Sequence, residues 1–453
     1  MKRFAPVILV VILVIFSFGV GFFIHALFFD CEIQTDPTSS SPVTLDSKKE
    51  STHLSKALDT EGVYWQRMFE LFWNEVEGEK GELDWSSIDE HVKELNKMEI
   101  YPLAMVKPFA NWDQDACHGE EYEASYDPQK GGTVKVGKPC DMGAFKEFLA
   151  KAVERYDGDG KEDMPGLEIP VKYWEIMNEP SMQGGTEGGM GEDLKFFVGT
   201  SQEYLDILKA SYEVIKQADP EAKVVQGGQA GMHDNFVDFW TPVFEGGGAN
   251  YFDIANIHAI SVNESNESLY IIRFKEFLEK YDAEDKPIWV TEVQFGSLMN
   301  EPNDLKKFET LMVRASVFSL VQGADKLFYI ENWTHWDDEG GDMKKKFNSE
   351  EFADNSTHKV YLNLVDKINE FDEVVIIKEE YDESERDNEG ATSQVGQYKF
   401  VNGDRIVYVL WGDESVPSEI SGEVLVTDIY GESENINASD LELSDVPVFV
   451  ENI

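Results

Sequence analysis

Short apolar runs alternate with amphipathic segments along most of the chain. After Asp84, for example, Ile88, Val92 and Leu95 recur at spacings of four and three, the period of a helix with one apolar face. The apolar runs are shorter and continuous, as in strands buried on both faces. Strands are predicted over residues 63–69, 100–106, 171–179, 223–226, 252–258, 287–292 and 326–333. Helices are predicted over residues 84–95, 142–156, 200–217, 235–244, 268–281, 303–322 and 357–371.

Buried strands that alternate with helices over this length predict a (β/α)8 TIM barrel, in which helices surround an inner ring of parallel strands. The first strand of the ring is not evident. Residues 43–45 are its best candidate, and a short helix is predicted over residues 53–60. An open, doubly wound sheet is the alternative, but no Gly-rich phosphate loop follows any of the predicted strands.

The pattern changes after residue 372. Short segments that alternate or run apolar are separated by Gly, Asp and Asn turns, which predicts a small β-sandwich domain. The chain therefore divides into an N-terminal apolar segment (1–30), a linker rich in Ser, Thr and Pro (31–50), a barrel (51–372) and a β-sandwich (373–453).

The N-terminal segment predicts a membrane anchor. Residues 4–29 are apolar except for His25, and at about 1.5 Å per residue such a helix is long enough to cross a bilayer core of about 30 Å. Lys2 and Arg3 favour a cytoplasmic N-terminus, with the rest of the chain outside the cell membrane. A cleaved signal peptide is the alternative, and it would leave a secreted protein. The body of the protein is exported in either case.

The net charge of the chain limits the classes of molecule that the protein can bind. The 453 residues include 88 Asp and Glu against 39 Lys and Arg, a net charge of -49. Such a balance excludes nucleic-acid binding, which needs a basic surface. It keeps an exported protein soluble, and we expect a monomer.

Two predicted strands end in a glutamate. Asn178-Glu179-Pro180 closes an aromatic and aliphatic run, and proline stops the strand there. The run 287–292 ends in Glu292. Two carboxyl groups that face each other across a cleft can cleave a glycosidic bond. Glu175 lies about 13 Å down the strand from Glu179 at about 3.3 Å per residue, so we expect it to be an inward or packing carboxylate.

With these motifs, the sequence over residues 50–370 resembles the large clan of retaining glycoside hydrolases with a (β/α)8 barrel. In that clan an acid/base glutamate follows an Asn at the end of strand four, and the nucleophile ends strand seven. With an undetected first strand counted, Glu179 and Glu292 end the fourth and seventh strands. The appended β-domain suits members of the β-xylosidase and α-iduronidase type.

The resemblance implies double displacement on an oligo- or polysaccharide, with Glu292 as nucleophile, Glu179 as acid/base and no cofactor. Asn178 would bind the sugar 2-hydroxyl, Arg67 would hold Glu292 ionised, and His258 would bind the nucleophile or the substrate. Trp333 would form an apolar floor for the sugar. Transglycosylation and non-catalytic binding of a surface carbohydrate are the alternatives.

Two further features lie outside this pair of glutamates. Asp157, Asp159 and Asp163 are spaced like the start of a calcium loop, although Lys161 occupies the fifth position and an exposed acidic turn is the favoured explanation. Cys117 and Cys140 flank a loop after the predicted strand 100–106, and in an exported protein we expect them to form a disulfide.

Overall fold

Parallel strands form the centre of the molecule. The structure is a computed structural model that describes residues 47–55, 62–124, 135–184, 194–260, 262, 265–295, 305–330, 356–383 and 390–453. One parallel sheet has the order β1-β2-β3-β4 and a second has the order β5-β6-β7. The strands are β1 (Trp65–Phe72), β2 (Tyr101–Lys107), β3 (Tyr173–Ile176), β4 (Lys223–Val225), β5 (Ala255–Ala259), β6 (Ile288–Val293) and β7 (Ala324–Tyr329). Parallel bridges from Val225 to Ile254 and from Gln229 to Ile257 join the two sheets.

The first strand of the ring is the segment 53–55. Leu54 forms a parallel bridge with Leu327 of β7, and Ser55 N donates to Leu327 O at 2.9 Å. The predicted location at 43–45 lies outside the described residues, and the helix predicted over 53–60 is wrong at its start. Leu54 is the one apolar residue that the segment contributes to the core, so its apolar pattern does not predict a strand. The side chain of Asn369 holds it, accepting from Leu54 N at 2.7 Å.

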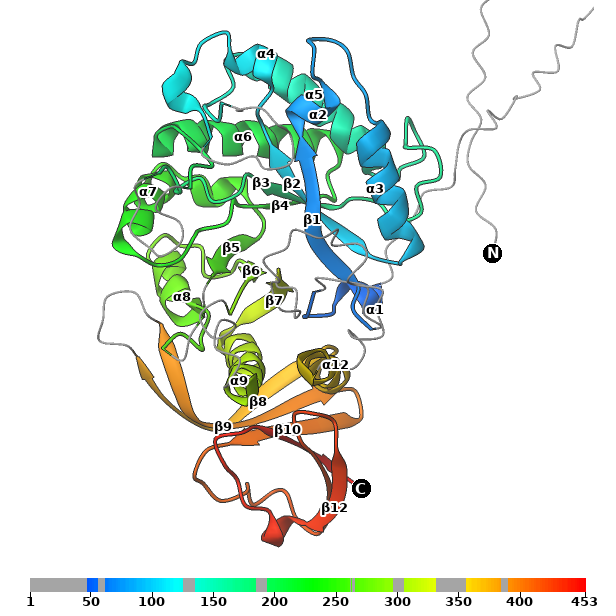
Figure 1. Cartoon of the computed structure of the whole chain (residues 1–453), viewed down its shortest axis with the longest axis vertical. Coiled ribbons are helices and arrows are strands. Elements are labelled where there is room, and N and C mark those ends of the chain that lie inside the picture. The colour runs from blue at the N-terminus through cyan, green and yellow to red at the C-terminus, as the bar shows by residue number, and fades with distance from the viewer. Residues whose placement is uncertain are drawn as a thin grey trace, which may run out of the picture. The chain divides into compact units, whose positions relative to one another are not determined.

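Helices follow most strands and cover the ring from outside (Figure 1). They bury the faces that the sequence pattern predicts: Ile88, Val92 and Leu95 of α3 are all buried. A capping box formed by Thr200 and Glu203 starts α6. The helices are α1 (Ser47–Glu50), α2 (Trp73–Val76), α3 (Ser86–Lys97), α4 (Asn111–Gln114), α5 (Met142–Tyr156), α6 (Ser201–Ala218), α7 (Asp234–Glu245), α8 (Ile271–Glu279), α9 (Leu305–Gln322) and α12 (Ser356–Ile368).

Aromatic side chains fill the N-terminal end of the ring. Trp65, Tyr101, Trp289 and Phe328 are buried in one cluster, and Lys326 Nζ lies 4.6 Å from the centre of the Trp65 ring. The Lys326 ammonium also donates to the carbonyl of Glu50 at 2.8 Å. Because this end is filled by packed side chains, a ligand site belongs at the opposite end, where the carboxyl ends of the strands lie.

The C-terminal part is an antiparallel sheet with the order β12-β11-β13-β10-β9-β8, which forms the lower part of Figure 1. Its strands are β8 (Glu373–Glu383), β9 (Ala391–Asn402), β10 (Arg405–Trp411), β11 (Glu423–Thr427), β12 (Ser433–Asn437) and β13 (Val448–Asn452). Alternate residues of β10 enter different apolar clusters: Val407 and Val409 join the main core, whereas Tyr408 and Leu410 join a second cluster. In the described residues, the domain predicted as a β-sandwich is a single six-stranded antiparallel sheet with an apolar cluster on each face.

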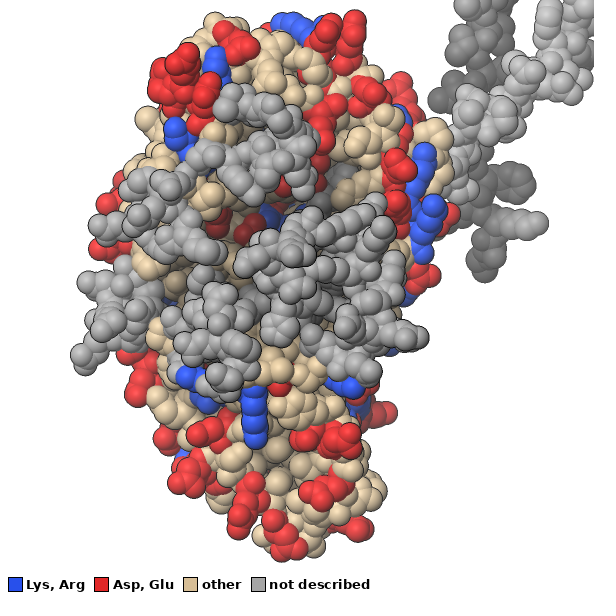
Figure 2. All heavy atoms as spheres, viewed as in Figure 1, with Lys and Arg blue, Asp and Glu red and all other residues tan. Residues whose placement is uncertain are grey.

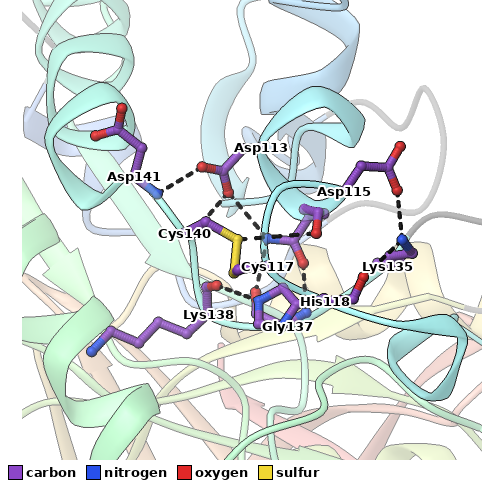
Figure 3. Close-up of a disulfide and its surroundings, with 10 residues drawn as sticks. Asp113, Asp115, Cys117, His118, Lys135, Gly137, Lys138, Cys140 and Asp141 are labelled. Atoms are coloured by element: carbon purple, nitrogen blue, oxygen red, sulfur yellow. Dashed lines mark hydrogen bonds and ion pairs between the residues drawn. A yellow bond between two sulfur atoms is a disulfide. The ribbon is translucent and has the colours of Figure 1, made fainter.

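A disulfide joins Cys117 and Cys140, as predicted (Figure 3). It fastens the loop after β2, at the carboxyl end of the strand. The buried side chain of Asp113 accepts from the backbone N–H of Cys140 at 2.9 Å and of Asp141 at 2.7 Å. The crosslink and the buried carboxylate therefore hold the same two chain segments together.

Acidic side chains spread over the face shown in Figure 2, with fewer basic ones between them, as the net charge of -49 requires. Within the described ranges, no helix is both long and apolar enough to cross a membrane. The predicted anchor at residues 4–29 lies outside those ranges, so it stays a prediction of the sequence.

Candidate active site

The predicted site residues converge at the carboxyl end of the parallel strands. Arg67 comes from β1, Asn178 and Glu179 follow β3, His258 lies in β5 and Glu292 lies near the end of β6. These strands are far apart in the sequence, and the barrel brings their ends together. Trp333 lies outside the described residues.

Irregular pairing in two strands helps to direct the side chains. Two residues of β1, Arg67 and Met68, lie opposite a single residue of β2, and Thr291 is the extra residue of β6 opposite β5. Such bulges re-aim side chains next to active sites. Here they place Arg67 and Glu292 within contact of each other.

The backbone at Glu179 is strained. β3 ends at Ile176, and Met177 and Glu179 then adopt φ values of 72° and 36°, in the left-handed region that residues other than glycine rarely enter. The turn is held by Met177 N, which donates to Val106 O at 3.1 Å, and by Met182 N, which donates to Glu179 O at 2.8 Å. This geometry turns Glu179 inward, where the residue is only 6% exposed.

Arg67 binds two glutamates and an amide. Its Nε and Nη2 donate to the two carboxylate oxygens of Glu175, each at 2.7 Å, and its Nη1 donates to Glu292. Nη2 also donates to Asn178 Oδ1 at 2.7 Å. Glu175 is the inward carboxylate that the sequence predicted, and it is completely buried. It positions the guanidinium that in turn holds Glu292 and Asn178.

His258 lies between the two glutamates at the site. Its Nδ1 is 2.8 Å from Glu179 Oε1 and 3.7 Å from Glu292 Oε2, and its Nε2 is 2.9 Å from Thr291 Oγ1. The ring is completely buried. A Cβ atom at residue 228 would lie 2.0 Å from His258 Nε2, so Gly228 is required for the ring to take this position.

Burial and charge move the pKa values of these groups in different directions. Burial raises the pKa of Glu179, although its hydrogen bond to His258 opposes the shift. Burial would also raise the pKa of Glu175, but Arg67 lowers it to about 2. The surroundings of the two carboxyl groups therefore act in opposite directions: Arg67 favours the ionised form of Glu175, whereas burial favours the protonated form of Glu179.

Glu179, His258 and Glu292 each place one side-chain oxygen or nitrogen within 4.8 Å of the others. A metal ion could be bound by such a group, but these atoms already have partners: Glu292 binds Arg67, and Glu179 binds His258. The arrangement instead suits two carboxyl groups that act on the same bond, because retaining glycosidases place theirs about 5–5.5 Å apart.

The acidic loop at 157–163 precedes β3 and therefore lies at the other end of the strand from Glu179. Asp157, Asp159 and Asp163 also approach within 4.8 Å. Their oxygens accept from loop amides, among them Asp159 N to Asp157 at 3.0 Å and Gly160 N to Asp163 at 2.9 Å, and Lys161 binds Asp159. These contacts account for the loop as a self-capped turn, and calcium binding there stays a prediction.

Sequence reasoning found the charged residues of the site and missed the neutral ones around His258. Thr291 precedes Glu292 and gives no signal of its own, and Asn256 is one of several buried residues of β5. The contacts of both residues arise between neighbouring strands, so no local pattern in the sequence marked them.

No model of a protein family matches the sequence, and no curated protein sequence matches it. Solved structures do match. One is a family 39 glycoside hydrolase from the gut symbiont Bacteroides cellulosilyticus WH2, with a TM-score of 0.55 and 17% identity over 88% of this chain and 77% of that one. A monomeric β-xylosidase from Caulobacter crescentus CB15 matches with a TM-score of 0.51 and 14% identity over 91% and 97% of the two chains. The GH39 enzyme from Xanthomonas axonopodis pv. citri has a TM-score of 0.51 and 12% identity over 92% and 96%.

At these identities the similarity shows the fold. The chain has the barrel and appended β-domain of glycoside hydrolases, as the sequence resemblance predicted.

The pair of Arg67 and Glu175 generates a prediction for stability. Removing one partner of a buried ion pair leaves the other charge uncompensated, so Glu175→Gln is expected to lower the free energy of unfolding at pH 7 by about 3–5 kcal/mol. Because the pKa of Glu175 is lowered from 4.5 to about 2 by Arg67, its contribution is complete above pH 4.5 and is lost as the pH falls toward 2. Urea unfolding between pH 2 and pH 7 measures both effects. Equal slopes with pH for the variant and the wild type would contradict the assignment, and Glu90→Gln, on the exposed face of α3, is the control.

Proposed function

We propose that the protein is a retaining glycoside hydrolase that cleaves O-glycosidic bonds of an oligo- or polysaccharide. The observation that carries this proposal is the approach of Glu179 and Glu292 within 4.8 Å of each other in contrasting surroundings. Glu292 accepts a hydrogen bond from the guanidinium of Arg67. Glu179 is buried and its pKa is raised. An oriented carboxylate suits a nucleophile, and a carboxyl group with a raised pKa suits an acid.

In the first half of the reaction, Glu292 attacks the anomeric carbon, and the bond between that carbon and the leaving oxygen breaks. Glu179 gives its proton to that oxygen. In the second half, Glu179 takes a proton from water while the water oxygen bonds to the anomeric carbon and the ester to Glu292 breaks. Each glutamate ends the cycle in the state in which it began.

Two neighbours position the substrate and the nucleophile. Asn178 presents its oxygen to Arg67 at 2.7 Å, which directs its NH2 group away from the guanidinium as a donor for the sugar 2-hydroxyl. Arg67 orients the carboxylate of Glu292 through a hydrogen bond. Trp333 remains the sequence-based candidate for an apolar floor under the sugar.

Purely non-catalytic binding of a carbohydrate does not require this arrangement. A binding site needs apolar and hydrogen-bonding groups for the sugar, but it gains nothing from a strained Glu179 placed against a second carboxylate. Because one solved structure of similar fold is described as a β-xylosidase, aryl β-xylosides are the first substrates to test. The membrane-anchored, extracytoplasmic location proposed from the sequence would expose the site to polysaccharides outside the cell.

The stereochemistry of the first product tests the proposed mechanism. Two displacements at the anomeric carbon are expected to give a first product with the same anomeric configuration as the substrate. Proton NMR of the anomeric signals during hydrolysis of an aryl glycoside follows this directly. An inverted first product would overturn the double displacement, and the absence of hydrolysis in a broad panel of aryl glycosides and polysaccharides would overturn the enzyme assignment.

Glu292→Ala removes the nucleophile. We expect kcat to fall by on the order of 10⁵-fold or more, the scale of loss when a covalent nucleophile is removed. Initial rates on an aryl glycoside measure it, with circular dichroism to confirm folding. Glu90→Gln is expected to keep wild-type rates, and turnover of Glu292→Ala close to wild type would sink the assignment.

Glu179→Ala removes the acid. On substrates with a poor leaving group, the rate is expected to fall by about 10²–10⁴-fold, the usual contribution of general acid catalysis. The glycosylation step should be spared for aryl glycosides whose leaving phenol is acidic, since that phenolate departs without a proton. A comparison of kcat/KM across phenols of decreasing acidity measures this difference. An equal loss for every leaving group would argue against Glu179 as the acid.

A further inference from the structure

His258 lies close to Glu175, Glu179 and Glu292 as well as to Thr291. Its Nδ1 approaches both glutamates, at 2.8 Å from Glu179 Oε1 and 3.7 Å from Glu292 Oε2. Its Nε2 lies 3.9 Å from Glu175 Oε1, besides its bond to Thr291. Three carboxyl groups therefore surround one buried imidazole, with the guanidinium of Arg67 bound to two of them.

The hydrogen bonds on the Nε2 side determine where a proton must lie. Asn256 Nδ2 donates to Gln226 O at 3.2 Å, so its Oδ1 faces Thr291, where it accepts from the backbone N–H at 3.3 Å. The Thr291 hydroxyl donates its single hydrogen to the same Oδ1 at 2.9 Å. Only a lone pair of Thr291 Oγ1 remains for His258, so Nε2 must carry a hydrogen and donate it.

The Nδ1 side also faces oxygen acceptors. A carboxylate oxygen always accepts, and a protonated carboxyl group keeps one oxygen that accepts. Both ring nitrogens of His258 can thus donate at the same time, which is the hydrogen-bonding pattern of an imidazolium. Burial lowers the pKa of His258, but the charge of Glu292 and the hydrogen bonds to Glu175 and Glu179 raise it above its usual value.

The charges around the ring balance in this state. Arg67 and His258 are positive and Glu175 and Glu292 are negative, while Glu179 holds its proton. After Glu292 has formed an ester and Glu179 has given up its proton, the positive groups are unchanged and the negative ones are Glu175 and Glu179. An uncompensated charge is costly in a buried site, and a cationic His258 avoids one in both states.

We propose that His258 stays an imidazolium throughout the reaction and stabilises whichever glutamate carries the negative charge, with Thr291 and Asn256 as the residues that hold it in position. This inference rests on the proposed function for the movement of charge between the glutamates. His258 itself exchanges no proton in the cycle. In the free enzyme it faces the charge of Glu292, and in the glycosyl-enzyme its bond to Glu179 becomes a charge-assisted one.

Nitrogen NMR of the intact protein tests the proposal without reference to activity. In protein labelled with ¹⁵N at histidine, long-range ¹H–¹⁵N correlations distinguish an imidazolium, with two similar nitrogens, from a neutral ring, with two dissimilar ones. The signal of His258 is the one that His258→Gln removes. The wild type is expected to show an imidazolium at pH 7 that becomes neutral only at higher pH. A neutral ring at pH 7 would overturn the proposal.

Two variants separate the proposed role from a purely structural one. Thr291→Val removes the acceptor of the Nε2 hydrogen and is expected to lower the titration point of His258 by about one pH unit, the value of one net hydrogen bond. Thr291→Ser keeps the acceptor and is expected to restore the wild-type titration. If Thr291→Val does not fold, Glu292→Gln provides the second test, because loss of the neighbouring charge should also lower the titration point. An unchanged titration in the folded variants would overturn the role of these contacts.

The two proposals fail in different ways. A protein that hydrolyses glycosides with a neutral His258 would overturn this inference and leave the proposed function intact. A protein with an imidazolium at residue 258 and no activity on any glycoside would overturn the transfer of charge together with the proposed function.

Discussion

The site depends on the buried ion pair between Arg67 and Glu175. Glu175 takes up two of the guanidinium's donors, at 2.7 Å each, which fixes the plane of the group and directs its remaining donors at Glu292 and Asn178. A buried guanidinium is tolerated only when such partners satisfy its charge. Glu175 takes no part in the proposed reaction, but it determines, through Arg67, where Glu292 and Asn178 are held.

The same constraint explains why Glu175 and Glu179 behave so differently on one stretch of chain. Glu175 lies within β3, where the regular strand points it into the ring beside a positive charge. Glu179 comes after the strand, on a backbone with φ of 36°, and it meets an imidazole instead. The pKa is therefore lowered at Glu175 and raised at Glu179, although only four positions separate the two residues.

The sequence predicted the parts of this arrangement that depend on local pattern. Continuous apolar runs revealed the strands, and glutamates at their ends revealed the pair Glu179 and Glu292. The sequence did not reveal the segment 53–55 as a strand, because a strand with one core residue has no periodicity. A distant side-chain amide, that of Asn369, holds the segment in place. Thr291 and Asn256 escaped because their roles arise only when β5 and β6 lie side by side. Contacts between strands, unlike apolar patterns within them, are not encoded at neighbouring positions.

The segment 53–55 also affects how the chain can be shortened. It enters the ring beside β7, and the carbonyl of Glu50 just before it receives the buried ammonium of Lys326. The segment 53–55 is thus one of the strands of the barrel and lies next to β7. A cut beyond Leu54 would open the ring and leave the polar edge of β7 without its neighbour.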